Sequence, residues 1–336
     1  MSSALALKNW NIAPQYFTTP AVQVEVREVT RDMAGQFINY LDASPKTVET
    51  YTIALRQFFT YMEQNLIRYP QREDIVDFRE GLRAAGRKPT TIQNYITVVK
   101  LFFSWTALEG LYPNIAYHLK GAKLDNNFKK DYLTASQVDD VLEAIRPTKM
   151  TLTEARDFAI VALMSECGCR CIEIARAKVE DIRVHAGQTV FYYQGKGHEE
   201  RTQYKVVPPE AERVIRAYLK LRGNYNDSDP LFISTSNNSN GNALTTRSIS
   251  GIAKASLRKA GFNSPRLTAH SLRHTFVTLS IKGGEDLESV REAAGHKDRN
   301  TTERYNQNVK AEQNTCTKTV ENQLDKDKFK WTEQVL

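Results

Sequence analysis

Apolar residues recur at helical spacing through the first third of the chain. One stripe comprises Tyr51, Leu55, Phe58, Phe59 and Met62, and a second comprises Ile92, Tyr95, Ile96, Val99, Phe102, Phe103 and Trp105. Positions three and four apart share one face of a helix, so both stripes predict amphipathic helices. Ser44 followed by Pro45 marks the start of the first, because serine accepts hydrogen bonds from free amides and proline suits the first helical position. A shorter helix is predicted over residues 72–84.

The pattern changes after the first helical region. Residues 121–132 are polar and lack periodicity, which predicts a linker. Thr134 and Gln137 then form a capping-box pattern that opens a second helical region. Its further helices are expected over residues 158–175, 210–221, 246–260, 271–281, 287–294 and from 301 to about 305.

Two short β-type runs interrupt the second region. Residues 189–193 and 204–207 flank Gly195-Lys196-Gly197, and this arrangement predicts a hairpin. The expected fold class is mainly α with a small antiparallel β-sheet. The expected parts are an N-terminal arm (1–27), a helical domain (28–120), a linker (121–132), a second domain (133–310) and a C-terminal tail (311–336).

Composition and charge narrow the classes of protein. Hydrophobic residues make up 41% and charged residues 25%, which is typical of a globular chain. The formal net charge of +7 favours a polyanionic partner, of which nucleic acid is the commonest. We find no signal peptide and no apolar run of membrane-spanning length, so we expect a protein of the bacterial or phage-host cytosol without membrane contact.

The cysteines form no disulfide framework. Cys167, Cys169 and Cys171 alternate within five residues and cannot pair sensibly with one another, which fits a reducing compartment. On a helix only positions 167 and 171 would share a face, and no further ligands follow at zinc-site spacing. We therefore expect no metal and no other cofactor.

Candidate chemistry gathers in the last third of the chain. His270 and Arg273 are three residues apart, and Tyr305 follows His296 by nine. On a helix His270 and Arg273 share a face, and the planar guanidinium suits a phosphate. Two arginines and a histidine could hold the non-bridging oxygens of a phosphodiester, while a lysine on a hairpin tip could deliver a proton. A tyrosine hydroxyl near such cations becomes easier to ionise and can attack phosphorus.

The ordered set of these residues resembles the tyrosine recombinase and phage integrase family, which includes lambda-integrase-like and Xer-like members. The matching motifs are Gly168-Cys169-Arg170-Cys171-Ile172-Glu173, Gly195-Lys196-Gly197, His270-Ser-Leu-Arg273-His274-Thr275-Phe276, Gly295-His296, and Thr301-Thr302 before Tyr305. All six key positions occur in the family's order. One departure is Cys169, where the family often has leucine. Cysteine is small and apolar enough to pack there, although it hints at redox sensitivity.

The resemblance covers roughly residues 28–310 and implies a two-domain clamp around duplex DNA. Residues 44–51 and 90–105 are similar to the helices of the family's SAM-like core-binding domain. The resemblance implies that Tyr305 forms a 3′-phosphotyrosine, while Arg170 and Arg273 bind the non-bridging oxygens. It further implies that Lys196 protonates the leaving oxygen, that His270 takes part in proton transfer and that His296 donates a hydrogen bond to the phosphate. No metal and no ATP are implied.

Other residues receive plainer interpretations. His274 is expected to be structural, behind Arg273, and the remaining histidines, His118, His185 and His198, are expected at the surface. DNA contacts by the first domain are assigned to basic and hydroxyl side chains at two helix starts, although a solvated loop would explain the second set equally well. These residues are Lys46, Thr47, Arg87, Lys88, Thr90 and Thr91.

The expected function is a site-specific DNA recombinase for integration or excision of a mobile element or phage. The N-terminal arm and the tail after Tyr305 favour this role over a Xer-like resolvase of chromosome or plasmid dimers. A strand-rejoining enzyme like the type IB topoisomerases shares the chemistry, and a DNA-binding regulator without catalysis is a further alternative. The expected partners are double-stranded DNA with specific recombination sites, further copies of the chain in a tetramer on DNA, and accessory DNA-bending or directionality proteins. The tail is either packed on its own domain or docked on a neighbouring subunit.

Overall fold

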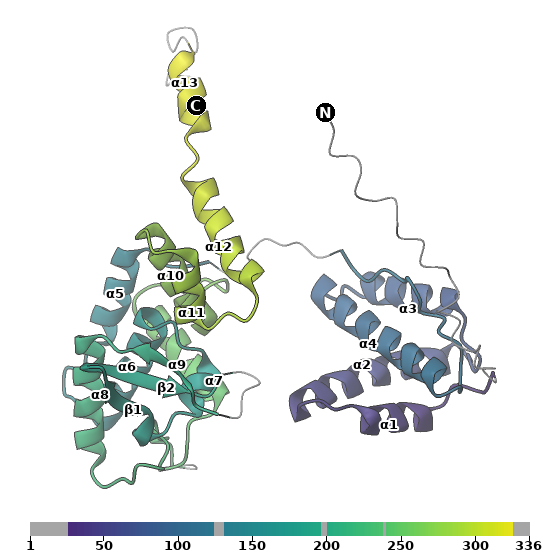
Figure 1. The fold of residues 1–336 in the computed structure, drawn as a ribbon, viewed down its shortest axis with the longest axis horizontal. Coiled ribbons are helices and arrows are strands. Elements are labelled where there is room, and N and C mark those ends of the chain that lie inside the picture. The colour runs from purple at the N-terminus through teal and green to yellow at the C-terminus, as the bar shows by residue number, and fades with distance from the viewer. Residues whose placement is uncertain (1–25, 124–130, 196–199, 238–239, 325–336) are drawn as a thin grey trace, which may run out of the picture. The chain divides into compact units, whose positions relative to one another are not determined.

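The computed structural model describes residues 26–123, 131–195, 200–237 and 240–324 (Figure 1). The chain divides into two compact units, residues 1–127 and residues 128–336. No helix in the described ranges is both long and apolar enough to cross a membrane.

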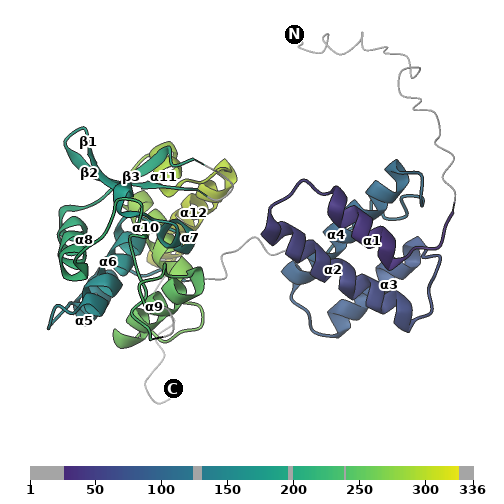
Figure 2. The ribbon, with the colours of Figure 1, turned by 90° about the horizontal axis from the view of Figure 1, so that it is seen from below.

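The first unit is a bundle of helices (Figure 2). Its elements are α1 (Arg31–Tyr40), α2 (Pro45–Gln64), α3 (Arg72–Ala84) and α4 (Pro89–Leu108). Ser44 caps α2 by accepting a hydrogen bond from the Thr47 amide, and Pro45 occupies the first turn, as the sequence predicts. The predicted helix over residues 72–84 is confirmed by α3.

Aromatic side chains dominate the core of this unit. The rings of Phe58 and Phe103 meet edge to face with centroids 5.9 Å apart, and Phe37 meets Phe102 in the same way at 5.8 Å. Such edge-to-face pairs add to the free energy gained by burying their area. The two apolar stripes predicted from the sequence therefore face one another inside the bundle.

The second unit is mostly helical around one small sheet. Its elements are α5 (Ala135–Ile145), α6 (Leu152–Glu166), α7 (Cys171–Ala175), η2 (Val179–Asp181), β1 (Ile182–His185), β2 (Gln188–Tyr193), β3 (Gln203–Val206), α8 (Pro209–Arg222), α9 (Thr246–Lys259), α10 (Ala269–Lys282), α11 (Leu287–Ala294), α12 (Arg299–Glu312) and α13 (Cys316–Gln323). The sheet is antiparallel in the order β1-β2-β3. The fold class is as expected, mainly α with a small antiparallel sheet, and the hairpin between β2 and β3 is confirmed. β1, which pairs with the start of β2, was not predicted from the sequence.

The single helix predicted over residues 158–175 is wrong. α6 ends at Glu166, and α7 begins only at Cys171. Gly168 between them adopts a φ of +61°, a left-handed conformation that interrupts an α-helix and costs glycine least. The Cys169 amide then donates to the Leu163 carbonyl and closes the end of α6. The break matters because Arg170 lies directly after it.

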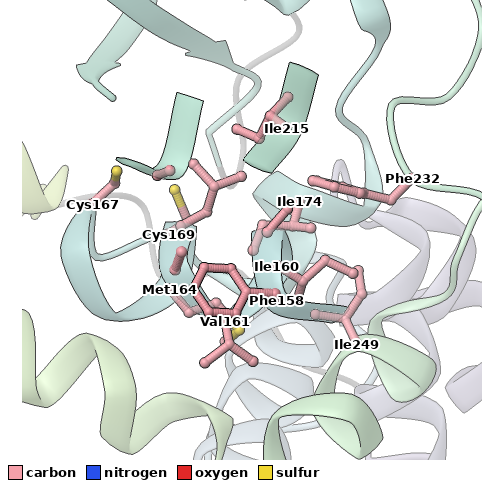
Figure 3. Packing of buried hydrophobic residues seen from close by; sticks show 14 of the residues in the cluster. Phe158, Ile160, Val161, Met164, Cys167, Cys169, Ile174, Ile215, Phe232 and Ile249 are labelled. Carbon is pink, nitrogen blue, oxygen red and sulfur yellow. The ribbon is translucent and has the colours of Figure 1, made fainter. Parts of the chain in front are cut away.

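α6 runs through the middle of the second unit, and its apolar side chains face several neighbours. Figure 3 shows Phe158, Ile160 and Val161 of α6 together with Ile174 of α7, Ile215 of α8 and Ile249 of α9. Cys167 and Cys169 belong to the same cluster. The departure at Cys169 is therefore a buried apolar position, and its thiol is completely enclosed.

The helix that carries Tyr305 is longer than the sequence predicts. α12 extends from Arg299 to Glu312, and the Asp298 side chain caps its start by accepting from the Asn300 amide. α13 continues beyond α12, away from the other helices of its unit (Figure 1), and all of its side chains are exposed.

Candidate active site

Arg170 occupies the N-cap of α7, where the break after α6 turns its side chain toward α11. Its backbone amide and Nη1 both donate to the Glu173 carboxylate, at 2.9 and 2.7 Å. Its Nη2 donates to the Gly295 carbonyl at 2.8 Å. Glu173 is fully buried, whereas the Arg170 side chain remains 26% exposed. The guanidinium is thus held in one orientation while part of it stays open to a ligand.

Arg273 on α10 lies deeper than Arg170 and is only 1% exposed. Its Nη1 donates to the Gly168 carbonyl at 2.6 Å, and its Nη2 donates to the Ala294 carbonyl. Burial, together with the nearby charge of Arg170, lowers the pKa of Arg273 to about 10. The side chain therefore stays positively charged at neutral pH, and two arginines lie side by side.

Two glycines allow the backbone to approach these arginines. A Cβ on Gly168 would lie 2.5 Å from Cδ1 of Phe276, and a Cβ on Gly295 would lie 2.7 Å from the Tyr193 hydroxyl. Both glycines have φ of +61°. A side chain at either position would be strained and would collide, so the carbonyls that orient the arginines depend on glycine there.

Tyr305 on α12 is only 3% exposed. Its ring stacks on His296 with centroids 5.9 Å apart and an interplanar angle of 13°, and it lies 5.0 Å from the His274 ring. Burial raises the pKa of Tyr305 to about 12, while the charges of Arg273 and Arg170 act to lower it. The hydroxyl therefore lies within the field of both arginines.

The histidines of the site differ in their surroundings. His296 is buried, and its Nδ1 is 2.9 Å from the Thr302 hydroxyl. Burial and the charges of Arg273 and Arg170 lower the pKa of His296 to about 3, so its ring is neutral at physiological pH. His270 is exposed on α10, and its ring meets that of His274 edge to face at 4.6 Å. His274 thus lies between His270 and Tyr305.

An open cleft of about 1040 Å³ borders this cluster. Its walls include Arg170, Gly195, His296, Lys297 and Thr301. Lys196, the expected proton donor, lies outside the described residues, as does His198. Gly195, the residue before Lys196, is part of the cleft wall.

Lys205 and Glu173 were not predicted from the sequence to belong to the site. Lys205 is the middle residue of the run Tyr204-Lys-Val206, and simple alternation would point its charge outward. The structure has the opposite arrangement: Lys205 is 5% exposed, whereas Tyr204 and Val206 are 44% and 49% exposed. The position of Glu173 three residues after Arg170 was visible in the motif, but that spacing did not reveal their ion pair.

A second group of polar side chains lies at the far end of α12. The Tyr132 hydroxyl donates to Glu312 at 2.5 Å and accepts from Lys282 at 2.7 Å, while Lys282 and Glu312 form an ion pair at 2.7 Å. Glu312 ends α12, Lys282 ends α10 and Tyr132 precedes α5. The three side chains therefore join the start of the second unit to the helix of Tyr305.

The candidate DNA contacts of the first unit lie at the starts of two helices. Lys46 and Thr47 are in the first turn of α2, and Lys46 forms an ion pair with Glu49 at 2.7 Å. Arg87, Lys88 and Thr90 are exposed, Thr91 is half-buried, and Lys88 is the N-cap of α4. His118 and His185 are exposed, as expected. In the described part of the chain no three His, Cys, Asp or Glu side chains are placed to hold a metal ion.

Comparisons with known proteins match both units. Residues 131–312 match the phage integrase family, and residues 34–110 match the N-terminal SAM-like domain of phage integrases. The tyrosine recombinase XerA of Pyrococcus furiosus is 30% identical over 277 residues, which cover 82% of this chain and 88% of the relative. The tyrosine recombinase XerD of Listeria monocytogenes is 29% identical, with 82% and 93% coverage.

Solved structures show the same fold at lower identity. The XerH recombinase bound to a palindromic difH substrate, in a post-cleavage complex, has a TM-score of 0.68 and 21% identity over 87% of this chain and 90% of its own. The Tn1549 transposon integrase in complex with transposon right end DNA has a TM-score of 0.64 and 17% identity, with 82% and 93% coverage.

Proposed function

Because the chain belongs to the phage integrase family of tyrosine recombinases, enzymes that cleave and rejoin DNA strands, we propose that Tyr305 is its nucleophile. The Tyr305 oxygen attacks the scissile phosphorus, the bond from phosphorus to the 5′-oxygen breaks, and a 3′-phosphotyrosine and a free 5′-hydroxyl result. The observation that carries this proposal is the position of the Tyr305 ring against His296 and within the field of two oriented arginines.

Arg170 and Arg273 bind the non-bridging oxygens in this proposal. Each guanidinium has five N–H donors, and each uses some of them on the protein itself, on Glu173 and backbone carbonyls. The donors that remain are pre-oriented toward the charge that develops on the non-bridging oxygens, and stabilisation of such charge by oriented donors is usually the largest contribution to the rate.

Three further residues complete the proposed proton movements. His270 takes part in proton transfer with Tyr305 or the phosphate, and Lys196 gives a proton to the departing 5′-oxygen. Because Nδ1 of His296 faces Thr302, Nε2 is the nitrogen that would donate to the phosphate. In the second step the 5′-hydroxyl of the partner strand attacks the phosphotyrosine and Tyr305 leaves with its proton restored. The ester conserves the energy of the broken bond, so the exchange needs no ATP.

A covalent trapping experiment tests the nucleophile. Nicked duplexes prepared from genomic DNA of the source organism serve as suicide substrates, and protein–DNA adducts are separated on a denaturing gel. We expect adducts with the wild type and none with Tyr305→Phe. Tyr225→Phe, a change at an exposed tyrosine near Arg222, is the matched control and should retain them. An adduct that survives Tyr305→Phe would exclude this nucleophile.

We propose that the first unit contacts backbone phosphates through Lys46, Thr47, Arg87, Lys88, Thr90 and Thr91. Most of these side chains are exposed, and all of them lie at helix starts, where free amides and the helix dipole favour phosphate. The same proposal makes double-stranded DNA with specific recombination sites the main partner. Accessory DNA-bending or directionality proteins remain part of the proposed reaction.

The proposed biological role is integration or excision of a mobile element. Resolution of chromosome or plasmid dimers is the second candidate, favoured by the similarity to recombinases named XerA and XerD. Sequencing the DNA attached to trapped adducts distinguishes the two roles, because attachment at the ends of an element supports the first and attachment at a single chromosomal or plasmid site outside any element supports the second. Relaxation of supercoils without strand exchange would instead indicate topoisomerase-like activity.

We also propose that the enzyme acts as a tetramer on DNA and that α13 docks on a neighbouring subunit. Its side chains are exposed, including Val320 at 56% and Leu324 at 57%. Apolar side chains on such a helix gain free energy by covering one another or a partner surface. Deletion of residues 315–336 should prevent assembly of the synaptic complex in gel-shift experiments. Unchanged assembly would contradict the docking.

A further inference from the structure

The C-terminal turn of α11 has an unusual set of partners. Its carbonyls at Ala293, Ala294 and Gly295 accept hydrogen bonds, in that order, from Lys205, Arg273 and Arg170. The last carbonyls of a helix have no partner within the helix and carry the negative end of its dipole, so cations suit them. Three consecutive carbonyls thus bind three separate cations, directly before His296.

Two of these cations are arginines that the proposed function places on the scissile phosphate, whereas Lys205 is not. Lys205 lies on β3, opposite Phe191 of β2 in the sheet register. Its ammonium is 5.1 Å from the centre of the Tyr193 ring and 6.0 Å from that of Phe276. The sheet, α10 and the end of α11 therefore meet at this one buried charge.

Burying the positive charge of Lys205 costs free energy. Burial lowers the pKa of Lys205, and the nearby charge of Arg273 lowers it further. A buried ammonium is tolerated where hydrogen bonds and aromatic faces compensate for lost water, and the Ala293 carbonyl and two rings provide both. A methionine of similar length would fill the same space without that cost. This contrast indicates that the charge, and not only the volume, has a purpose here.

We propose that Lys205 is a positioning residue for DNA cleavage: it fixes the end of α11, so that the next two carbonyls orient Arg273 and Arg170 and His296 is presented to Tyr305. This inference rests on the proposed function, because it assumes that both arginines bind the scissile phosphate. Lys205 itself does not touch DNA in this proposal. It acts through the backbone of the turn that spans residues 293–296.

The first test measures cleavage by Lys205→Met, which keeps the length of the side chain and removes its charge. Since a displacement of about 1 Å at a reacting group can cost roughly a hundredfold, we expect the single-turnover rate constant of adduct formation to fall roughly ten- to hundredfold. The dissociation constant for DNA should stay within about twofold. Lys205→Arg, which restores a cation, should recover part of the rate.

Arg222→Met is the matched control. Arg222 on α8 is also buried and also donates to backbone carbonyls, those of Pro230 and Leu231, but no contact is found between it and the described residues of the proposed site. It should lower the melting temperature without slowing cleavage below the unfolding transition. Equal rates for Lys205→Met and Arg222→Met, or a loss in Lys205→Met explained wholly by weaker DNA binding, would overturn the proposal.

A double-mutant cycle asks whether Lys205 acts through Arg273. If it does, Lys205→Met combined with Arg273→Lys should slow cleavage less than the product of the two single effects. Independent, multiplying effects would contradict the mechanism.

Hydrogen exchange in the DNA-free protein gives a readout that does not depend on catalysis. The amides of Gly295 and His296 donate to the carbonyls of Glu292 and Arg291. We expect Lys205→Met to accelerate their exchange roughly tenfold, as loss of a buried charged hydrogen bond implies, and Arg222→Met to leave it unchanged. Faster exchange with a wild type that forms no adduct would refute the proposed function and keep the role of Lys205 in the turn. Unchanged exchange would refute the role of Lys205 itself.

Discussion

The two units of the molecule use their interiors differently. In the described part of the first unit Thr106 is the one buried polar residue, and the rest of its core is apolar and largely aromatic. The second unit buries many more polar side chains, among them Arg156, Glu173, Lys205, Arg273, His274 and His296. Most of these charges lie beside Tyr305 or the cleft. The interior of the first unit is thus almost wholly apolar, whereas that of the second keeps charged and polar groups buried and oriented.

The largest expected effect is a loss of stability caused by a substitution in the core of the first unit. Phe102→Ala removes a completely buried ring that contacts Phe37, Phe59 and Phe103, and should lower the free energy of unfolding by about 3–5 kcal/mol. Urea unfolding of the full chain measures it. Leu101→Ala, at the preceding position, which is 41% exposed, should lower the free energy of unfolding by less than about 0.5 kcal/mol. Similar losses for the two variants would break the distinction.

The next effect belongs to the second unit and concerns rate rather than stability. Arg273→Lys keeps a positive charge but cannot bind Gly168 and Ala294 with a planar fork. We expect the rate constant of adduct formation to fall about 10²–10³-fold, in line with loss of an oriented donor at developing charge. Arg222→Lys, in a buried site away from the cleft, should cleave at the wild-type rate. A stability loss without a rate loss would place Arg273 with the structural residues.

The neutral histidines of the second unit predict an acid-sensitive stability. The pKa values of His274 and His296 are lowered from 6.5 to about 3, mainly by burial. The histidines therefore take up protons at a higher pH in the unfolded chain than in the folded chain. Their contribution to the free energy of unfolding is complete above pH 6.5 and is lost as the pH falls toward 3. At pH 5 each histidine should lower the free energy of unfolding by up to about 2 kcal/mol relative to its value above pH 6.5.

Urea unfolding between pH 4 and pH 8 measures this slope. His274→Gln should flatten it, whereas His185→Gln, at an exposed position on β1, should leave it unchanged. An equal slope in His274→Gln and the wild type would show that the buried ring is not responsible.

The smallest effect is expected at the surface of the first unit. Arg87→Ala should weaken DNA binding about equally for all sequences and reduce the slope of log affinity against log salt by about 1, as loss of one phosphate contact implies. Titrations at several salt concentrations measure the slope. Arg146→Ala, an exposed arginine at the end of α5 paired with Glu143, is the control and should leave the slope unchanged. An unaltered slope in Arg87→Ala would remove it from the proposed contacts.

The sequence predicted the first unit better than the second for a physical reason. Apolar spacing predicted α2, with its cap at Ser44, and also α3 and α4. No separate helix was predicted where α1 lies. α6 is buried on almost every side, so its pattern continues without a break into Cys167 and Cys169. Only the left-handed Gly168 ends it, and a glycine inside an apolar run does not disclose its φ angle.

The candidate site shows the same limit. The order and spacing of Arg170, His270, Arg273, His296 and Tyr305 were visible in the sequence. In the structure Arg170 and His296 line the cleft, whereas Tyr305 lines a second pocket together with His274. Their roles stay predictions. The orienting contacts were not visible, because they are made by backbone carbonyls that every residue carries. The burial of Lys205 on β3 was not visible for a related reason. Alternation of polar and apolar residues predicts a strand, but it does not show which residues of the strand depart from the pattern.

The contact between Tyr132, Lys282 and Glu312 has a mechanical consequence. Tyr132 comes soon after the segment that connects the two units, and Glu312 is the last residue of α12, about two turns beyond Tyr305. A pull on the connecting segment first loads the ion pair of Asp131 with Arg266 and then, through the Tyr132 hydroxyl, the helix of the nucleophile. A pull on the C-terminal tail loads the same end of this helix, because the tail continues directly after Glu312. Both tensions converge on three side chains, whose strength sets how much force α12 can bear before Tyr305 shifts.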